Sequence, residues 1–270
     1  MLTAACAVVA TPAHSSLIHH YEFFAGVTDS GSVPISGTLA GSGGSGLPTA
    51  TGGVLTLDGV DDFVSFGPDT YLVPIAPSFG SLNFTVMLFA KFSSNGTQDF
   101  YSQGGGGHAL YMGPNGIEMR VTDNYHFWTT VDSPVNGGGC GSGSDNCTGV
   151  ATPSDGEWHN YALTASGSDA AFYIDGVLKA TRSGFILSDG GVATVLGRQF
   201  NSSEYFGGSL SDVRIYDIAL AGSEVFEIAT GLSAAPEPQS ALLLFGALIA
   251  TVSVARRRRR GHAASAYPKN

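Results

Sequence analysis

Three aspartates within five positions form the densest group of side chains able to ligate a metal. Asp58, Asp61 and Asp62 lie in the segment Leu57-Asp58-Gly59-Val60-Asp61-Asp62. Carboxylates at this density can hold a hard cation such as calcium. The same residues suit a hairpin turn at Asp58-Gly59, in which a short acceptor side chain bonds neighbouring backbone amides. We expect the turn, and an ion at this cluster is the alternative.

A histidine that could act as a general base follows the tryptophan in Trp158-His159. We expect Trp158 to begin a strand and to pack inside the fold, which gives His159 a structural role. The sequence contains neither G-x-S-x-G nor H-E-x-x-H. No Glu has an Asp two positions on, as the E-x-D-x-x-E set of lichenase-like glycosidases requires. Retaining glycoside cleavage needs two carboxyls about 5 Å apart. We therefore predict that the protein is not an enzyme, with a polysaccharide hydrolase as the alternative.

Aromatic and polar side chains alternate in Asn124-Tyr125-His126-Phe127-Trp128. Exposed aromatic rings stack on sugar rings, and neighbouring amides and carboxylates bond the hydroxyls. Tyr125 and Trp128 are thus candidate ligand-binding residues. In a strand the two rings would point to opposite faces, so one of them is also a candidate for the core.

Two cysteines close a short loop rich in glycine and serine, Cys140-Gly-Ser-Gly-Ser-Asp-Asn-Cys147. A local disulfide between Cys140 and Cys147 is expected if the chain is exported to oxidising surroundings. A metal pair is the weaker interpretation, because no second Cys or His pair accompanies it.

The charges are unevenly distributed. Six of the 12 basic residues, but only Glu237 of the 22 acidic ones, lie in the last 35 residues. The rest of the chain carries six basic and 21 acidic residues, a net charge of −15. Such a surface repels phosphate backbones, which argues against nucleic-acid binding, and it is compatible with calcium.

The chain has many short segments with strand character and a single short helix candidate. Phe84, Val86, Leu88 and Phe92 alternate with other residues, which predicts one wholly apolar face. Residues 37–53 have no apolar period and are expected to be a loop. The helix candidate has Ser223 as its N-cap and ends at Gly231. This pattern predicts an all-β antiparallel sandwich. Further strands are expected at 17–24, as two short strands around the Asp58-Gly59 turn within 54–66, and at 108–112, 117–121, 126–131, 158–165, 171–175, 177–180, 192–196 and 210–216.

Four collinear segments resemble those of the laminin-G-like, concanavalin A-like jelly rolls. They are Leu57-Asp58-Gly59-Val60-Asp61-Asp62-Phe63-Val64, Phe84 to Lys91, Trp158 to Thr164 with Phe172 to Val177, and Phe206 to Tyr216 with Ala219, Leu220 and Glu224. The resemblance implies a jelly-roll β-sandwich. It also implies a structural calcium ion held by an Asp in the loop after the first strand and by the Asp preceding Val-Arg-Ile-Tyr. These would be Asp29 and Asp212, with backbone carbonyls and waters completing the shell. The alternative is that Asp29 caps a turn and Asp212 faces solvent.

The C-terminal residues carry three ordered features: Pro236-Glu237-Pro238, an apolar run from Ala241 to Ala255, and five arginines, Arg256 to Arg260. A helix over this run would be about 24 Å long, which snorkelling arginines can fit to the membrane, and the arginines keep that end cytoplasmic. The order resembles the PEP-CTERM sorting signal of bacterial exported proteins, which implies a transmembrane helix and recognition by an exosortase-type processing protease. A plain single-span anchor is the alternative.

We therefore predict a signal-peptide remnant at 1–16, a jelly-roll domain at 17–232, a sorting signal with a single transmembrane helix at 233–260 and a cytoplasmic tail at 261–270. The protein would be anchored in the inner membrane before processing and then displayed at the cell surface or in the extracellular matrix. Its expected role is recognition or adhesion, with extracellular polysaccharide as the partner. A purely structural matrix role is the alternative.

Overall fold

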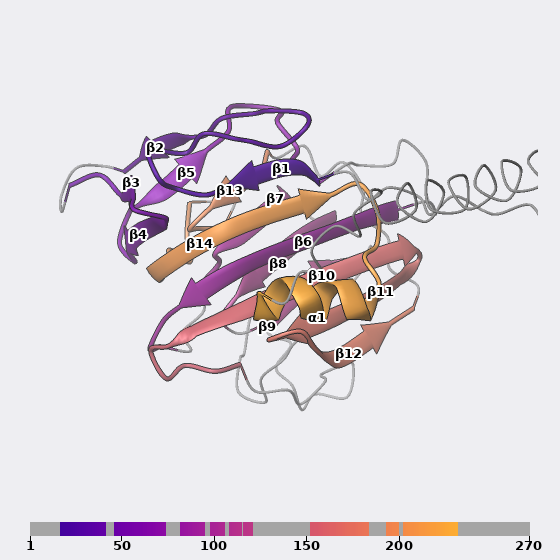
Figure 1. The fold of residues 1–270 in the computed structure, drawn as a ribbon. Coiled ribbons are helices and arrows are strands. Elements are labelled where there is room, and N and C mark those ends of the chain that lie inside the picture. The colour runs from indigo at the N-terminus through magenta and orange to yellow at the C-terminus, as the bar shows by residue number, and fades with distance from the viewer. Residues whose placement is uncertain are drawn as a thin grey trace, which may run out of the picture. The chain divides into compact units, whose positions relative to one another are not determined.

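Two antiparallel sheets stacked face to face make up the fold (Figure 1). The computed structural model describes residues 17–41, 46–73, 82–94, 98–105, 108–114, 116–120, 152–183, 193–199 and 202–231. Within these ranges it has 14 strands and one helix. The all-β sandwich predicted from the sequence is confirmed.

The first sheet, sheet A, contains eight strands. Seven of them lie in the spatial order β12 (Val177–Arg182), β11 (Asp169–Ile174), β10 (Trp158–Gly167), β6 (Leu82–Lys91), β14 (Gly207–Tyr216), β4 (Val54–Asp58) and β3 (Thr49–Thr51). The eighth, β1 (Leu17–Tyr21), pairs with the end of β14.

The second sheet, sheet B, contains six strands. Their order is β2 (Thr38–Ala40), β5 (Phe63–Ser65), β13 (Val195–Leu196), β7 (Tyr101–Gly105), β8 (His108–Gly113) and β9 (Gly116–Arg120).

Strand β6 decides which side chains of sheet A face the core. Its even-numbered residues Phe84, Val86, Leu88 and Ala90 are buried in the space between the sheets, as their alternation predicts. Because β6 pairs with β10 and β14 along most of its length, its register assigns the faces of both neighbours. Tyr161, Leu163, Leu210, Val213 and Ile215 accordingly point into the same core.

Four aromatic rings pack against one another in the core. Phe100 lies 5.4 Å from Tyr161 and 5.6 Å from Phe206 between ring centroids, and Phe92 lies 5.9 Å from Phe206. Tyr161 lies in β10 and Phe206 directly precedes β14, both strands of sheet A, whereas Phe100 precedes β7 of sheet B. Edge-to-face contacts of this kind add to the free energy gained by burial alone.

Two sequence-based expectations about the N-terminal third are wrong. Residues 37–53 are not only loop, because they contain β2 and β3. These strands, Thr-Leu-Ala and Thr-Ala-Thr, are only three residues long, which is too short to show an apolar period. The strands on either side of Asp58-Gly59 form as expected but do not pair as a hairpin: β4 belongs to sheet A and β5 to sheet B. The turn between them crosses the sandwich.

The hairpin between β11 and β12 forms where Asp175-Gly176 predicts it. Both residues have positive φ, 52° and 73°, as in a type I′ turn. The single described helix, α1 (Gly222–Thr230), begins one residue before the expected N-cap Ser223, and the side chain of Glu224 accepts a bond from the amide of Ala221. Gly231 follows it with φ +68°, as the predicted stop requires.

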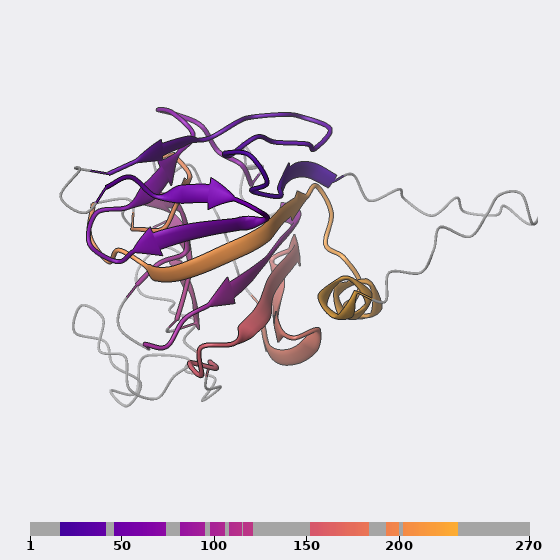
Figure 2. The same ribbon diagram turned by 60° about the vertical axis from the view of Figure 1, so that its left-hand side comes forward.

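Helix α1 lies beside the outer face of sheet A (Figure 2). Its buried Val225 packs with Met87, Ala162, Tyr173 and Tyr216. Among the described residues, the helix thus covers the part of that face formed by β6, β10, β11 and β14.

Several predicted features fall on residues that the structure does not describe: the strand at 126–131, the signal remnant at 1–16 and the whole C-terminal sorting signal. Among the described residues, no helix has both the length and the apolar character needed to cross a membrane.

Candidate functional site

The loop after the first strand is tied to β1 through the carboxylate of Asp29, which is buried. Its Oδ1 accepts hydrogen bonds from the amides of His20 at 2.7 Å and Gly31 at 2.8 Å. Its Oδ2 accepts from the amide of Ile35 at 2.8 Å and lies 2.7 Å from Nδ1 of His19. Burial acts to raise the pKa of Asp29, but these bonds from His20, Ile35, Gly31 and His19 hold it below the ordinary 3.8.

Asp212 sits at a bulge of β14 between Ser211 and Arg214, with a positive φ of 50°. Its carboxylate lies 2.7 Å from Nε2 of His20 and accepts two bonds from Arg214, at 2.7 and 2.9 Å. Burial acts to raise the pKa of Asp212, and the bonds from His20 and Arg214 outweigh it and lower the pKa. Asp212 therefore does not simply face solvent.

The structure thus joins the two aspartates through one residue, because the amide of His20 bonds Asp29 and its ring bonds Asp212. A carboxylate has about four lone-pair positions, and the four donors around Asp29 occupy them. These donors would have to be displaced for Asp29 to ligate calcium, and hydrogen bonds already link the first loop to the last strand. Calcium held by Asp29 and Asp212 stays a prediction. His19 and His20 are not among the residues predicted from the sequence. Neighbouring positions in a strand point to opposite faces, and this is the signal that could have indicated two different partners for them.

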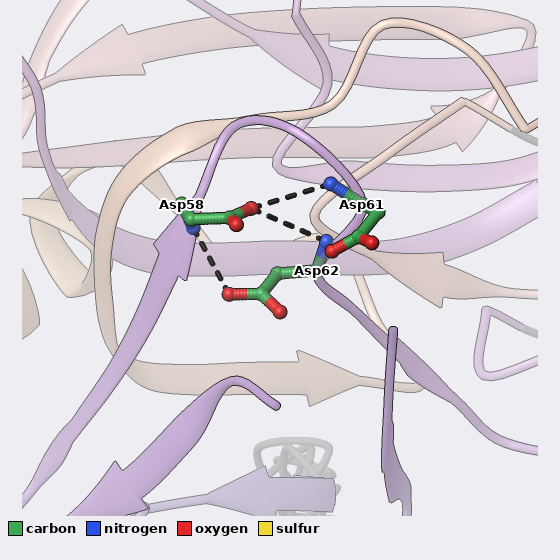
Figure 3. A group of neighbouring side chains, drawn as sticks. All are labelled: Asp58, Asp61 and Asp62. Atoms are coloured by element: carbon green, nitrogen blue, oxygen red, sulfur yellow. Dashed lines mark hydrogen bonds between the residues drawn. The ribbon is translucent and has the colours of Figure 1, made fainter. Parts of the chain in front are cut away.

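The Asp58–Asp62 turn has the hydrogen bonds predicted for it (Figure 3). Oδ1 of Asp58 accepts from the amides of Val60, Asp61 and Asp62 at 2.8, 3.2 and 3.4 Å. In return Oδ2 of Asp62 accepts from the amide of Asp58 at 3.1 Å. One oxygen of each of the three carboxylates lies within 4.8 Å of the others. Burial, followed by the charges of Asp58 and Asp61, raises the pKa of Asp62 against the opposing bond from the amide of Asp58.

The spacing of these carboxylates resembles that of a retaining glycosidase, but their setting differs. Asp62 is only 5% exposed, and one oxygen of Asp58 is occupied by three backbone amides. A glycosidic bond needs both carboxyls at an accessible surface. This arrangement suits stabilisation of the turn, or binding of an ion, better than contact with a polysaccharide.

His159 is bonded through both ring nitrogens. Its Nδ1 lies 2.7 Å from Asp175, and its Nε2 lies 3.2 Å from Asp155. Partial burial acts to lower its pKa, but Asp175 first and then Asp155 raise it above the ordinary 6.5. A general base needs a free nitrogen lone pair near neutral pH, and this imidazole is held toward its protonated form.

Trp158 begins β10 as predicted, but it does not pack inside the fold. It is 37% exposed on the outer face of sheet A, because Tyr161 and Leu163 of the same strand face the core and Trp158 has the opposite parity. The expectation of a core tryptophan is therefore wrong. The alternation of Tyr161, Leu163 and Ala165 was the signal in the sequence that could have shown this.

The pairing register places Trp158 in a row of side chains that crosses five strands. Trp158 pairs with Lys91, Lys91 with Ser209, Ser209 with Thr56 and Thr56 with Thr49. At strand spacings of about 4.8 Å the row is about 19 Å long. Lys91, Thr56 and Thr49 are exposed and Ser209 is half-buried. The row presents one aromatic ring, one ammonium group and three hydroxyls.

A second row lies beside the first on the same face. It contains Asn160, Phe89 and Ser211, which pair across β10, β6 and β14. Asn160 is buried and its Nδ2 donates to the carbonyl of Leu88 at 3.2 Å, while its Oδ1 has no hydrogen-bond partner. A polar acceptor thus borders the exposed row. We refer to Trp158, Lys91, Ser209, Thr56 and Thr49 as the outer row.

The other predicted site residues, Tyr125, Trp128, Cys140, Cys147, Pro236, Glu237 and Pro238, lie outside the described residues. The sugar platform, the disulfide and the sorting motif stay predictions.

We expect Asp29→Ala to lower the free energy of unfolding by about 3 kcal/mol, because the substitution leaves buried amides without acceptors. Thermal unfolding should show a Tm about 6–12 °C lower. Asp169→Asn, at an exposed position at the start of β11, is the matched control and should leave Tm unchanged. An Asp29→Ala protein as stable as the wild type would contradict the staple.

The same staple makes stability depend on acid. Because the pKa of Asp29 and Asp212 is lower in the folded chain than the ordinary 3.8, their contribution is present above about pH 4. It is lost as pH falls through the folded pKa. Between pH 6 and 3 the Tm of the wild type should fall more steeply than that of Asp29→Ala.

For His159 we expect an imidazole pKa above 6.5, measurable by NMR titration of its ring protons. Asp175→Asn should lower that pKa, because Asp175 makes the shorter bond, and Asp155→Asn should lower it less. A His159 that titrates at or below the ordinary value in the wild type would disprove the described pairing.

Comparisons with known proteins agree with the fold. The model of the family described as Concanavalin A-like lectin/glucanases superfamily, a laminin G-type model, matches residues 59–226. A sushi, von Willebrand factor type A, EGF and pentraxin domain-containing protein 1 from Rattus norvegicus is 32% identical over 111 residues. Its counterpart from Mus musculus has the same identity over the same length. The match covers 37% of this chain but only 3% of each relative's length.

Among solved structures, domain 4 of AbnA, an extracellular arabinanase from Geobacillus stearothermophilus, superimposes with a TM-score of 0.56 at 20% identity. The alignment covers 80% of this chain and 98% of that domain. The binding domain of Paraclostridial Mosquitocidal Protein 1 has a TM-score of 0.51 at 13% identity, over 80% of this chain and 52% of the other. At these identities the structures show a shared fold. Because the family model spans more than half of the residues, the chain belongs to the Concanavalin A-like lectin/glucanases superfamily as a laminin G-like jelly roll.

Proposed function

We propose that the protein is a non-enzymatic carbohydrate-recognition protein, and that the outer row of sheet A contacts the sugar. The observation that carries the proposal is the register that aligns an exposed tryptophan with Lys91 and three hydroxyls across five strands. Sugar rings stack on aromatic faces, and their hydroxyls bond to just such polar groups. The row extends across five strands, which suits a chain of sugars more than a single one.

Two further points support the proposal. The family is described as lectins and glucanases, and domain 4 of the arabinanase was solved in complex with arabinotriose. The segment with Tyr125 and Trp128 is the second place where sugar would stack, as its composition predicts.

The protein is proposed to act outside a bacterial cell, at the surface or in the matrix. This part of the proposal rests on Pro236-Glu237-Pro238, the apolar run and the arginines that follow it. An exosortase-type protease would process this signal after the helix has anchored the chain in the inner membrane. A purely structural matrix role would use the same delivery without any sugar contact.

A glycan array with the full chain tests recognition. Trp158→Ala should weaken binding of the selected glycan about tenfold, the loss expected for one stacking contact. Trp158→Phe should retain most of it. Phe226→Ala, which removes an exposed ring on α1 outside the outer row, is the control. Binding that survives Trp158→Ala but disappears in Trp128→Ala would move the site to the other segment. An array without any bound glycan would favour the structural role.

Mass spectrometry of the C-terminus of the mature protein tests the delivery route. We expect a terminus near Pro236 to Pro238 in material recovered from the cell surface or medium. An intact arginine cluster would instead indicate a permanent single-span anchor.

A further inference from the structure

The turn that carries the chain from sheet A to sheet B contains three carboxylates, and its own hydrogen bonds do not satisfy all of their oxygens. Oδ2 of Asp62 accepts the amide of Asp58, but Oδ1 of Asp62 is buried and has no hydrogen-bond partner. A carboxylate oxygen out of contact with water and without a donor is costly. The hydrogen bonds of the turn therefore leave Asp62 uncompensated.

That oxygen lies beside Gly41, the residue that follows β2. A Cβ atom placed on Gly41 would lie 3.1 Å from Oδ1 of Asp62, 3.4 Å from Oδ1 of Asp61 and 3.5 Å from the backbone carbonyl of Asp61. These three oxygens thus face the space that a side chain at residue 41 would occupy. Figure 3 shows the carboxylates of the turn bordering a common region.

We propose that this space binds a hard divalent cation, with calcium as the fitting ion, held by Asp61 and Asp62 in front of Gly41. Calcium takes six to eight oxygen ligands and accepts carboxylates, backbone carbonyls and waters together. The two carboxylates and the carbonyl of Asp61 supply the protein ligands, and waters complete the shell. All three protein ligands are oxygens, whereas structural zinc sites are built mainly from cysteine and histidine.

The electrostatics agree with this assignment. Burial and the charges of Asp58 and Asp61 raise the pKa of Asp62, so the folded protein disfavours a third negative charge here unless a cation is nearby. The site differs from the Asp29–Asp212 pair, where each oxygen of Asp29 already accepts two donors. It also differs from the outer row, and it does not depend on sugar binding.

An ion held by Asp61 and Asp62 would lie in the turn between the two sheets and beside the end of β2. Gly41 follows β2, and the turn links β4 of sheet A to β5 of sheet B. The turn is packed closely on its other side, since a Cβ on Gly59 would meet Gly207 at 2.9 Å. A cation would therefore fix the crossover between the sheets and stabilise the sandwich.

Thermal unfolding of the full chain, stripped of metal and then titrated with calcium chloride, tests the proposal. We expect a dissociation constant of about 0.1–1 mM and a Tm rise of about 3–5 °C at ten times that concentration. Asp62→Asn and Gly41→Ala should abolish the rise, the second by filling the space without changing charge. Asp212→Asn, the matched control at the other carboxylate pair, should keep it. Circular dichroism verifies that each variant is folded, and Gly41→Ala decides the result if Asp62→Asn does not fold.

Three results would overturn the proposal. A wild-type Tm that does not respond to calcium means that no stabilising ion binds. An equal response in Gly41→Ala places the ion elsewhere. Loss of the response in Asp212→Asn, with its retention in Gly41→Ala, assigns calcium to the Asp29–Asp212 pair.

Discussion

The alternation of strand β6 is the constraint on which the remaining structure depends. Every second side chain of this strand enters the core, and the strand pairs along most of its length with β10 and β14. A shift of one residue in either pairing would turn every side chain of the neighbour to the opposite face. The buried Val86 and Leu88 therefore determine indirectly that Trp158 and Ser209 point outward. The proposed sugar-binding surface follows from how the core is packed.

The aspartates show two outcomes of placing a carboxylate in a sandwich loop. Asp29 is buried with a full set of donors, so its charge is compensated within the protein and its pKa falls. Asp62 is buried with an incomplete set beside two other carboxylates, and its pKa rises. The first arrangement stabilises a loop without any ligand. The second has unused capacity for a positive charge, and this difference distinguishes a structural residue from a candidate ligand.

The sequence predicted the fold well where the pattern was local. The apolar face of residues 84–92, the type I′ turn at Asp175-Gly176 and the bonds of Asp58 to its own turn all depend on residues close in the chain, and all are confirmed. The sheet to which each strand belongs is not local. Nothing near Asp58-Gly59 indicates that β4 and β5 lie in different sheets, because both have the same short alternating pattern.

The candidate sites were predicted only in part for the same reason. The resemblance points to Asp29 and Asp212, but their common partner His20 depends on the pairing of β1 with β14. His20 lies 192 residues from Asp212 in the chain. Size alone favours a core position for Trp158, whereas the parity of its strand points it outward. To predict the outer row, the registers of four strand pairs must be known together. No single segment of the sequence contains that information.

The most direct test of the central claim is an NMR titration of the protein with the oligosaccharide that an array selects. If the outer row contacts the sugar, the indole signal of Trp158 and the amide signals of Lys91, Ser209 and Thr56 should shift together and saturate with one dissociation constant. The signals of α1 should stay in place. Shifts confined to residues outside this row, with Trp158 unaffected, would contradict the account.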